Sequence, residues 1–194
     1  MVTINYEGKA FELRNEPSEI SLKEFNKIFT ILNTPEKGKL EQYFDVFESL
    51  GVPSELLDEI EQADFIELVK QFNAMQVSTE TPINAIMIEG FNYIAYKDEF
   101  KFKAKDLIEI EKLAKRGVSN FPSMILAILF KREDLAPKEH YVLAHIEQKA
   151  KLFEKHCTAD FALPYITLVA RRTLKSLENV ESNNGSGVAG DSQS

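Results

Sequence analysis

The chain contains three histidines and one cysteine, the residue types that most often bind metals or act as nucleophiles. His145 and His156 are eleven positions apart, which separates them by about 16 Å along a helix, too far to share one metal ion. His140 and His145 are five positions apart, and no carboxylate stands at the helical spacing of a Glu-x-x-His motif. We therefore expect hydrogen-bonded or exposed histidines rather than metal ligands.

Cys157 directly follows His156, but adjacent residues of a helix point about 100° apart. The two side chains therefore do not form a catalytic dyad, and we expect Cys157 to be a small buried hydrophobe. The many carboxylates, such as Asp58 and Glu59, include no isolated pair in an apolar setting that would raise one pKa for general-acid catalysis. We expect no enzyme and no cofactor, although a small enzyme that uses Cys157 or a histidine stays an alternative without a proposed substrate.

Three glycines near the end of the sequence, Gly185, Gly187 and Gly190, match the letters of the dinucleotide-binding GxGxxG motif. That motif binds a pyrophosphate only where a strand leads into the glycines and a helix follows them. Here the sequence ends at Ser194 before any helix pattern appears. We therefore expect no nucleotide site there.

The composition of the chain limits the classes of protein to which it can belong. The 194 residues carry a formal charge of −8, which repels phosphate groups and argues against nucleic acid as a partner. The single cysteine and the absence of a secretory pattern at the start favour a reducing, cytoplasmic setting. The longest apolar run, Met124 to Phe130, is far shorter than the roughly 20 residues of a membrane span, so we expect no membrane partner.

The first 80 residues show the pattern of a hairpin followed by helices. Val2 to Tyr6 and Ala10 to Leu13 are β-prone runs around a Glu-Gly turn. Ser21 and Glu24 have the spacing of a capping box, and apolar residues then repeat at helical spacing. Further helices are predicted from Lys39 to Leu50 with Gly51 as the stop, briefly after Pro53, and from an N-cap at Asp64 to about Met75.

The pattern starts again after a polar, turn-rich stretch from Ser78 to Pro82. Residues 86–94 predict a second hairpin, and a shift of 82 positions places Glu7 and Gly8 on Glu89 and Gly90. The next helix aligns at the same shift. This order suggests an ancient duplication of one hairpin-plus-helices unit, although chance similarity of two common local structures stays open.

The second half is longer and more helical. We predict a helix from Ala104 to Arg116 ended by Gly117, an apolar helix opened by Pro122, a long helix opened by Pro137 and running from Lys138 to about His156, and a last helix from about Asp160 to Val180. The fold class is therefore a mostly helical α+β protein with two short hairpins. We divide it into a unit at 1–80, a second unit at 81–181 and a disordered tail at 182–194.

The second hairpin also contains the best candidates for contact with a partner. Aromatic side chains recur around it with few polar residues between them, and some could line a groove for a protein partner. The alternative is that they pack on the core of their own domain. The candidates are Phe91, Tyr93, Tyr96, Phe100 and Phe102.

The order of elements resembles a known class of proteins. The short hairpin with its Glu-Gly turn, the small acidic helices, the apolar helix from Phe121 to Phe130 and the C-terminal helix that begins with Thr158, Ala159, Asp160, Phe161, Ala162, Leu163 and Pro164 are similar to small helical proteins encoded among the tail and virion genes of tailed bacteriophages. Tail assembly chaperones are the nearest named group. The resemblance implies a non-enzymatic protein that shields an aggregation-prone tape-measure helix until the tail tube forms around it.

We therefore expect a protein that binds another protein, namely a phage tail assembly chaperone in the cytoplasm of the host. One alternative is a structural or packaged phage protein that stays in the virion. Another is an acidic adaptor or inhibitor that binds a host protein, which the charge of −8 permits. The sequence leaves a homo-oligomer open.

Overall fold

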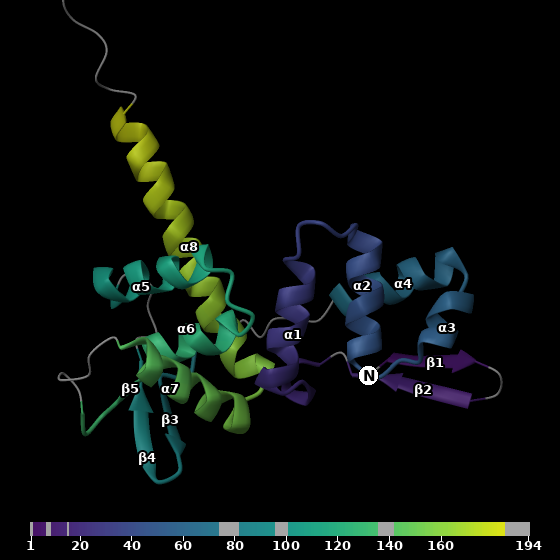
Figure 1. Ribbon diagram of the computed structural model, residues 1–194, viewed down its shortest axis with the longest axis horizontal. Helices are drawn as coiled ribbons and strands as arrows, with labels where there is room; N and C mark the ends of the chain where they lie inside the picture. Colours follow the sequence, from purple (N-terminus) through teal and green to yellow (C-terminus); the bar gives the residue numbers. More distant parts are fainter. Residues whose placement is uncertain are drawn as a thin grey trace, which may run out of the picture.

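The computed structural model describes residues 2–6, 9–14, 16–73, 82–95, 101–135 and 142–184 (Figure 1). Helices dominate this part of the chain, and two small antiparallel sheets accompany them, one of two strands and one of three. The predicted fold class, a mostly helical α+β protein, is therefore confirmed. The division into units at 1–80, 81–181 and 182–194 stays a prediction.

The first half folds largely as its local signals predict. Its elements are β1 (Val2–Tyr6), β2 (Lys9–Leu13), the 3-10 helix η1 (Pro17–Glu19), α1 (Leu22–Leu32), α2 (Lys39–Ser49), α3 (Ser54–Glu59) and α4 (Gln62–Asn73). Gly51 ends α2 with a φ of +94°, a backbone conformation that favours glycine. The predicted start of α4 is wrong, because the helix begins at Gln62 and Asp64 lies in its first turn.

The second half contains β3 (Ala85–Ile88), β4 (Phe91–Ile94), α5 (Ala104–Lys115), α6 (Phe121–Leu129), β5 (Lys131–Arg132), α7 (Leu143–His156) and α8 (Ala159–Asn184). The second hairpin is confirmed, and β5 pairs with β4 as a third strand that was not predicted. The predicted start of α7 is wrong, because Val142 is extended and the helix begins at Leu143. Residues 136–141, which include Pro137, Lys138 and His140, and residues 185–194 with the three tail glycines lie outside the described residues.

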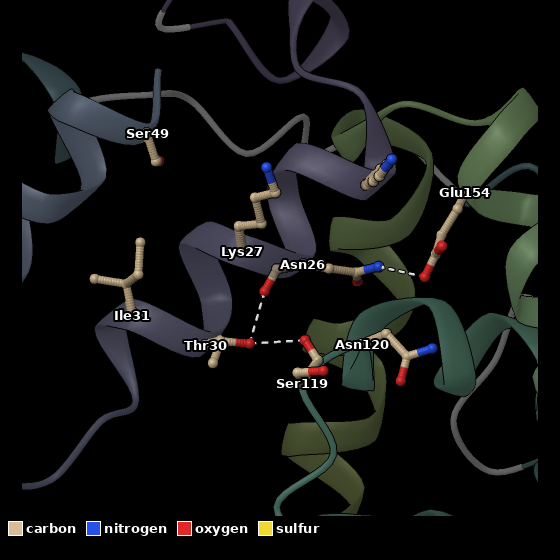
Figure 2. Close-up of a pocket in the computed structure, with 9 residues that line it drawn as sticks. Asn26, Lys27, Thr30, Ile31, Ser49, Ser119, Asn120 and Glu154 are labelled. Atoms are coloured by element: carbon tan, nitrogen blue, oxygen red, sulfur yellow. Dashed lines mark hydrogen bonds between the residues drawn. The ribbon is translucent and has the colours of Figure 1, made fainter. Parts of the chain in front are cut away.

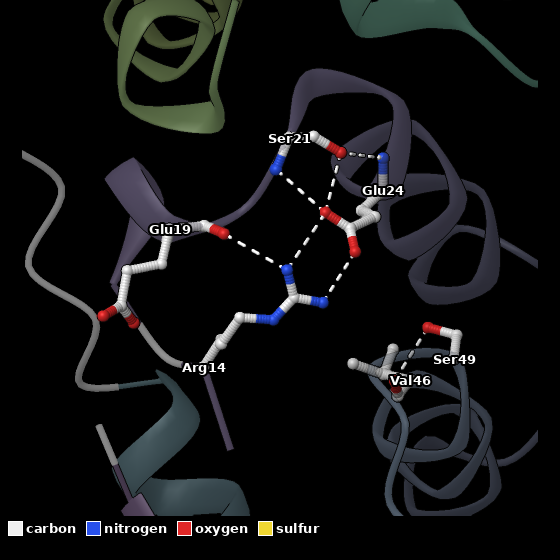
Figure 3. A network of polar contacts seen from close by, with 6 residues as sticks. All are labelled: Arg14, Glu19, Ser21, Glu24, Val46 and Ser49. Atoms are coloured by element: carbon white, nitrogen blue, oxygen red, sulfur yellow. Dashed lines mark hydrogen bonds and ion pairs between the residues drawn. The ribbon is translucent and has the colours of Figure 1, made fainter. Parts of the chain in front are cut away.

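The start of α1 shows how local chemistry fixes a helix end (Figure 3). The Ser21 hydroxyl accepts a hydrogen bond from the Glu24 backbone N–H, and the Glu24 carboxylate accepts one from the Ser21 backbone N–H at 3.0 Å. Arg14, just after β2, donates to the same carboxylate at 2.6 Å and so ties the first hairpin to α1. Burial alone would raise the pKa of Glu24, but the hydrogen bonds from Arg14 and Ser21 outweigh it and lower that pKa.

Two hydrophobic clusters form the core, and α1 contributes to both. Leu22 belongs to the cluster built from the second hairpin and α5 to α8, and Ile28 belongs to the cluster of β2 and α2 to α4. Phe25 packs against both clusters. Backbone hydrogen bonds also join the halves, because the Leu22 N–H donates to the Cys157 carbonyl and the Ala159 N–H donates to the Ile20 carbonyl, each at 2.9 Å.

Each half begins with a hairpin followed by two α-helices, although β5 has no counterpart in the described first half. The helix after the first hairpin begins at Leu22 and the helix after the second begins at Ala104, a shift of 82 positions that also relates α2 to α6. Buried residues match at this shift, as Ile20 corresponds to Phe102, Ile28 to Ile110 and Val46 to Ile128. We call residues 2–73 and 83–156 the first and second repeats. Their common origin stays a hypothesis.

Candidate protein-binding surface

The three-stranded sheet has one face on the core and one face toward solvent. Directly paired residues share a face, so the pairing of Ile86 with Tyr93 places both with Ile88 on the core side. The opposite face carries Ala85, Met87 and Ile94, together with Asn92 and Lys131, which pair directly with Met87 and Ile94. Met87 is 75% exposed and Ile94 is 37% exposed, although an antiparallel sheet normally presents polar side chains on its solvated face. These exposed apolar side chains are therefore unusual for a sheet surface.

The edge of β3 that faces away from β4 has no neighbouring strand among the described residues. The Ala95 N–H donates to the Asn84 carbonyl at 2.8 Å, so the pair of Asn84 and Ala95 is a hydrogen-bonded one. Such pairs alternate along an antiparallel ladder, and the backbone groups of Ala85 and Met87 therefore point away from β4. Among the described residues no backbone group pairs with them on that side. No charged residue or proline protects residues 83–88, although edge strands commonly carry such protection.

The turn of this hairpin is anchored to α7. Glu89 and Gly90 have φ values of 50° and 82°, the geometry of a two-residue turn that matches the twist of the strands. The Glu89 carboxylate accepts a hydrogen bond from Lys155 at 2.9 Å and lies 3.3 Å from the His156 ring nitrogen. Hydrogen bonding from Lys155, and then from His156, lowers the pKa of Glu89. The hairpin is thus held in one orientation.

We define the hairpin surface as Ile83, Ala85, Met87 and Ile94 together with the open edge of β3. The residues predicted from the sequence lie around the same hairpin but are other side chains. Tyr93 and Phe102 are only 5% and 6% exposed and belong to the core, so the prediction that they line a partner groove is corrected. Phe91 is exposed, with the Arg132 guanidinium 3.8 Å from its ring centroid. Tyr96 and Phe100 lie outside the described residues.

The side chains of the hairpin surface that the sequence did not indicate are aliphatic, whereas the predicted ones are aromatic. Strict alternation along β3 and β4 would have separated Met87 and Ile94 from Ile88 and Tyr93. Alternation alone does not say which face is covered, because both sets are apolar. In the structure α7 covers the face that carries Tyr93, because the ring of Phe153 packs against Tyr93 with 5.7 Å between centroids.

A second candidate, a polar pocket between the repeats, has a structural role (Figure 2). The buried Asn26 side chain of α1 donates to the Ser123 hydroxyl at 2.6 Å and to the Glu154 carboxylate at 2.8 Å. The Thr30 hydroxyl, one turn further along α1, donates to the Ser119 carbonyl at 2.7 Å. These bonds satisfy buried polar groups and fix α1 against α6 and α7. The lining residues hold the two repeats together.

Residues with catalytic or metal-binding potential are not gathered into a site in the described part of the chain. Burial, and then the nearby charge of Asp160, raises the pKa of the Cys157 thiol to about 12, so the reactive thiolate is scarce near neutral pH. Cys157 is the buried residue that the sequence predicts. Within the described ranges, no group of three or more His, Cys, Asp or Glu side chains could hold a metal ion. None of the described helices combines the length and apolarity needed to cross a bilayer.

Comparison of the chain with protein-family models, with curated proteins and with solved structures finds no match. The hairpin surface is therefore assessed on its own geometry.

Proposed function

We propose that this protein works by binding another protein and that the hairpin surface is the binding site. The bound segment is an extended, apolar stretch of the partner that adds a strand to the open edge of β3. The observation that carries the proposal is the combination of an exposed apolar face with outward backbone groups at Ala85 and Met87. Main-chain hydrogen bonds at such an edge supply affinity, and the neighbouring side chains supply specificity.

The chemistry of the face supports this role. Met87 is unbranched and polarizable, which suits a surface that adapts to different apolar side chains. Ile94 and Ile83 extend the apolar area on both sides of it. The anchor between Glu89 and α7 holds the hairpin in place before binding, which lowers the entropy lost when the partner is bound.

The resemblance to tail assembly chaperones gives this proposal a setting. In that setting the partner is a tape-measure protein, and binding covers an apolar stretch of it in an extended form, before that stretch becomes helical in the tail tube. A virion structural protein is the alternative from the same setting, and an adaptor for a host protein is the other. We also propose that the protein has no enzymatic activity, which fits the buried and protonated thiol of Cys157.

The proposal is tested with tagged full-length protein, capture of partners from the native source, and mass spectrometry. Met87→Asp places a charge on the apolar face and is expected to reduce capture about tenfold or more, because central apolar contacts dominate binding energy. Ala85→Pro removes one outward N–H without removing a bond to β4, and it is expected to reduce capture as well. Leu143→Asp, a change at an exposed apolar residue of α7, is the matched control.

Equal capture by Met87→Asp and by the original protein would overturn binding at this surface. If Met87→Asp abolishes capture and Ala85→Pro does not, strand addition is rejected, and the partner binds through apolar side-chain contact alone. Capture of a long helical virion protein, with this chain absent from mature particles, supports the chaperone setting. Presence in particles at fixed copy number supports the structural alternative, and capture of a host protein supports the adaptor.

A further inference from the structure

The first repeat has an apolar groove on its outer side. Apolar side chains of α2, of α3 and its C-cap, and of α4 line it, with Glu41 and Gln62 at its margin. The apolar residues are Leu40, Phe44, Leu57, Ile60 and Phe65. The Phe44 and Phe65 rings lie 6.4 Å apart and form its floor together with the buried Leu57. Leu40 is 49% exposed at the rim, where an incoming side chain would meet it.

The groove is surrounded by negative charge. Residues 39–73 contain nine carboxylates and two lysines, a formal charge of −7, which is most of the charge of the whole chain. Glu41 lines the groove, and Glu48 and Glu61 stand one helical turn from Phe44 and Phe65. An occupant of this groove must therefore combine an apolar side chain with surrounding positive charge.

Helix α5 of the second repeat has that combination. Ile108 is 50% exposed on its outer face, and Lys105, Lys112 and Lys115 lie on the same face at helical spacing. Residues 101–116 contain six basic and three acidic residues, and one of the acids, Asp106, is buried against Lys131. Lys112 pairs with Glu109 at 2.8 Å and Lys115 with Glu111 at 2.7 Å, so the positive charge is reduced locally but stays in excess over the segment. The exposed face of α5 is therefore a helix surface with a modest net positive charge and one exposed apolar side chain.

The groove and α5 lie at opposite ends of the long axis of the molecule (Figure 1). One chain therefore does not bring its own α5 into its own groove. Contact between two copies leaves a free groove at one end of the pair and a free α5 at the other. A head-to-tail contact of this kind continues into longer assemblies unless its rotation closes a ring.

We propose that copies of this protein associate head to tail, with the α5 face around Ile108 of one copy seated in the groove between α2, α3 and α4 of the next. The apolar contact of Ile108 with Leu40 and Phe44 supplies the centre of the interface. The lysines of α5 and the carboxylates around the groove supply charge attraction, which steers the two copies and favours this pairing over others.

Sedimentation velocity of the full chain over a range of concentrations tests this association. The expected result is a series of species from monomer upward, which shifts toward monomer when NaCl rises from about 0.05 M to about 0.5 M because salt screens the charges. Ile108→Asp and Leu40→Asp are each expected to weaken association about tenfold or more. Both residues are half exposed, so the fold tolerates the changes. Met87→Asp, on the hairpin surface, is the control and should associate as the original protein does.

A mixture of the two variants sharpens the test. Ile108→Asp keeps an intact groove, and Leu40→Asp keeps an intact α5, so the mixture is expected to form dimers and nothing larger. A monomer at all concentrations in the original protein would overturn the proposal. So would association that Ile108→Asp leaves unchanged, or a mixture that stays monomeric. Association lost with Leu40→Asp alone would mean that another segment occupies the groove, which also contradicts the assignment of α5.

Discussion

Helices α2 and α6 occupy corresponding positions in the two repeats, but they differ in how much of their surface is buried. In the second repeat, α6 is surrounded by α1, α5, α7 and α8, and its residues from Pro122 to Leu129 are buried. In the first repeat, α2 packs mainly on α1, α3 and the rings of α4. Accordingly, α6 has no charged residue, and α2 has Lys39, Glu41, Asp45 and Glu48. The number of neighbours, rather than the order of elements, determines which side chains each helix tolerates.

The distance between helices also differs between the pair α2 and α4 of the first repeat and the pair α6 and α7 of the second. Phe47 of α2 meets Phe65 and Phe72 of α4 edge to face, with centroids 5.7 and 5.5 Å apart. The equivalent pair in the second repeat, α6 and α7, packs through smaller residues such as Ala150, and their backbones lie closer together. Aromatic rings fill the space between α2 and α4, whereas α6 and α7 pack with their backbones close together.

The largest expected effect comes from exchanging residues between corresponding positions of α2 and α6. Ala127 is buried, and its counterpart Asp45 is half-buried and paired with Lys37. Ala127→Asp is expected to lower the free energy of unfolding by more than about 4 kcal/mol or to prevent folding, because it buries an unpaired carboxylate. Asp45→Ala removes a partly exposed ion pair and should cost only a small fraction of that. Urea unfolding of both variants measures the difference, and similar costs would contradict the contrast between α2 and α6.

An intermediate effect is expected at the contact between the repeats. Asn26→Ala leaves Ser123 and Glu154 without their shared donor, which is expected to cost about 1–3 kcal/mol of unfolding free energy. The second expected result is a loss of coupling, so that the near-ultraviolet and far-ultraviolet circular dichroism transitions no longer coincide. Thr30→Val, which removes a bond nearer the surface, is the milder comparison. Coincident transitions in Asn26→Ala would mean that the two repeats are held together mainly by their apolar contacts.

The smallest effect is expected at the helix starts, where the repeats are most alike. Glu24 and Asp106 occupy corresponding positions and each accepts a bond from the backbone N–H three residues earlier. Glu24→Ala is expected to cost about 0.5–2 kcal/mol at pH 7, because it removes the carboxylate that accepts hydrogen bonds from the Ser21 N–H and from Arg14. Because the folded state lowers the pKa of Glu24, its stabilisation is present above the unfolded pKa of about 4.3 and is lost as the pH falls through the folded value. Urea unfolding at pH 7 and at pH 3 should therefore show a smaller difference between the variant and the original protein at pH 3.

Elements with strong local signals could be predicted from the sequence. Ser21 with Glu24 marks the start of α1, Gly51 the end of α2, and the Glu-Gly pair at 89–90 the turn of the second hairpin. The predicted start of α7 is wrong because Pro137 has the pattern of a helix start, whereas Val142 is extended and the helix begins only at Leu143. Strand β5 was missed because two residues carry no periodicity, and their pairing with β4 depends on contacts far apart in the sequence.

For the candidate site too, one part could be predicted from local sequence and another part could not. Its location at the second hairpin follows from local pattern, and Phe91 does lie at the surface. Which face of the hairpin is exposed depends on where α7 packs, and that is settled by the anchor from Lys155 to Glu89 and by the ring contact of Phe153 with Tyr93. The groove of the first repeat depends on three helices meeting, which no single stretch of sequence encodes.

The short bridge between Ser21 and Thr158 has a consequence for the order of folding. It joins the beginning of α1 to the beginning of α8, and Ala159 belongs to the core of the first repeat. During synthesis from the N-terminus, the first repeat therefore lacks one of its core residues, Ala159, until all of the second repeat has been made. Closing so long a loop slows folding. In the interval, the nascent first repeat exposes apolar surface that the finished protein covers, and this is the stage at which aggregation is most expected.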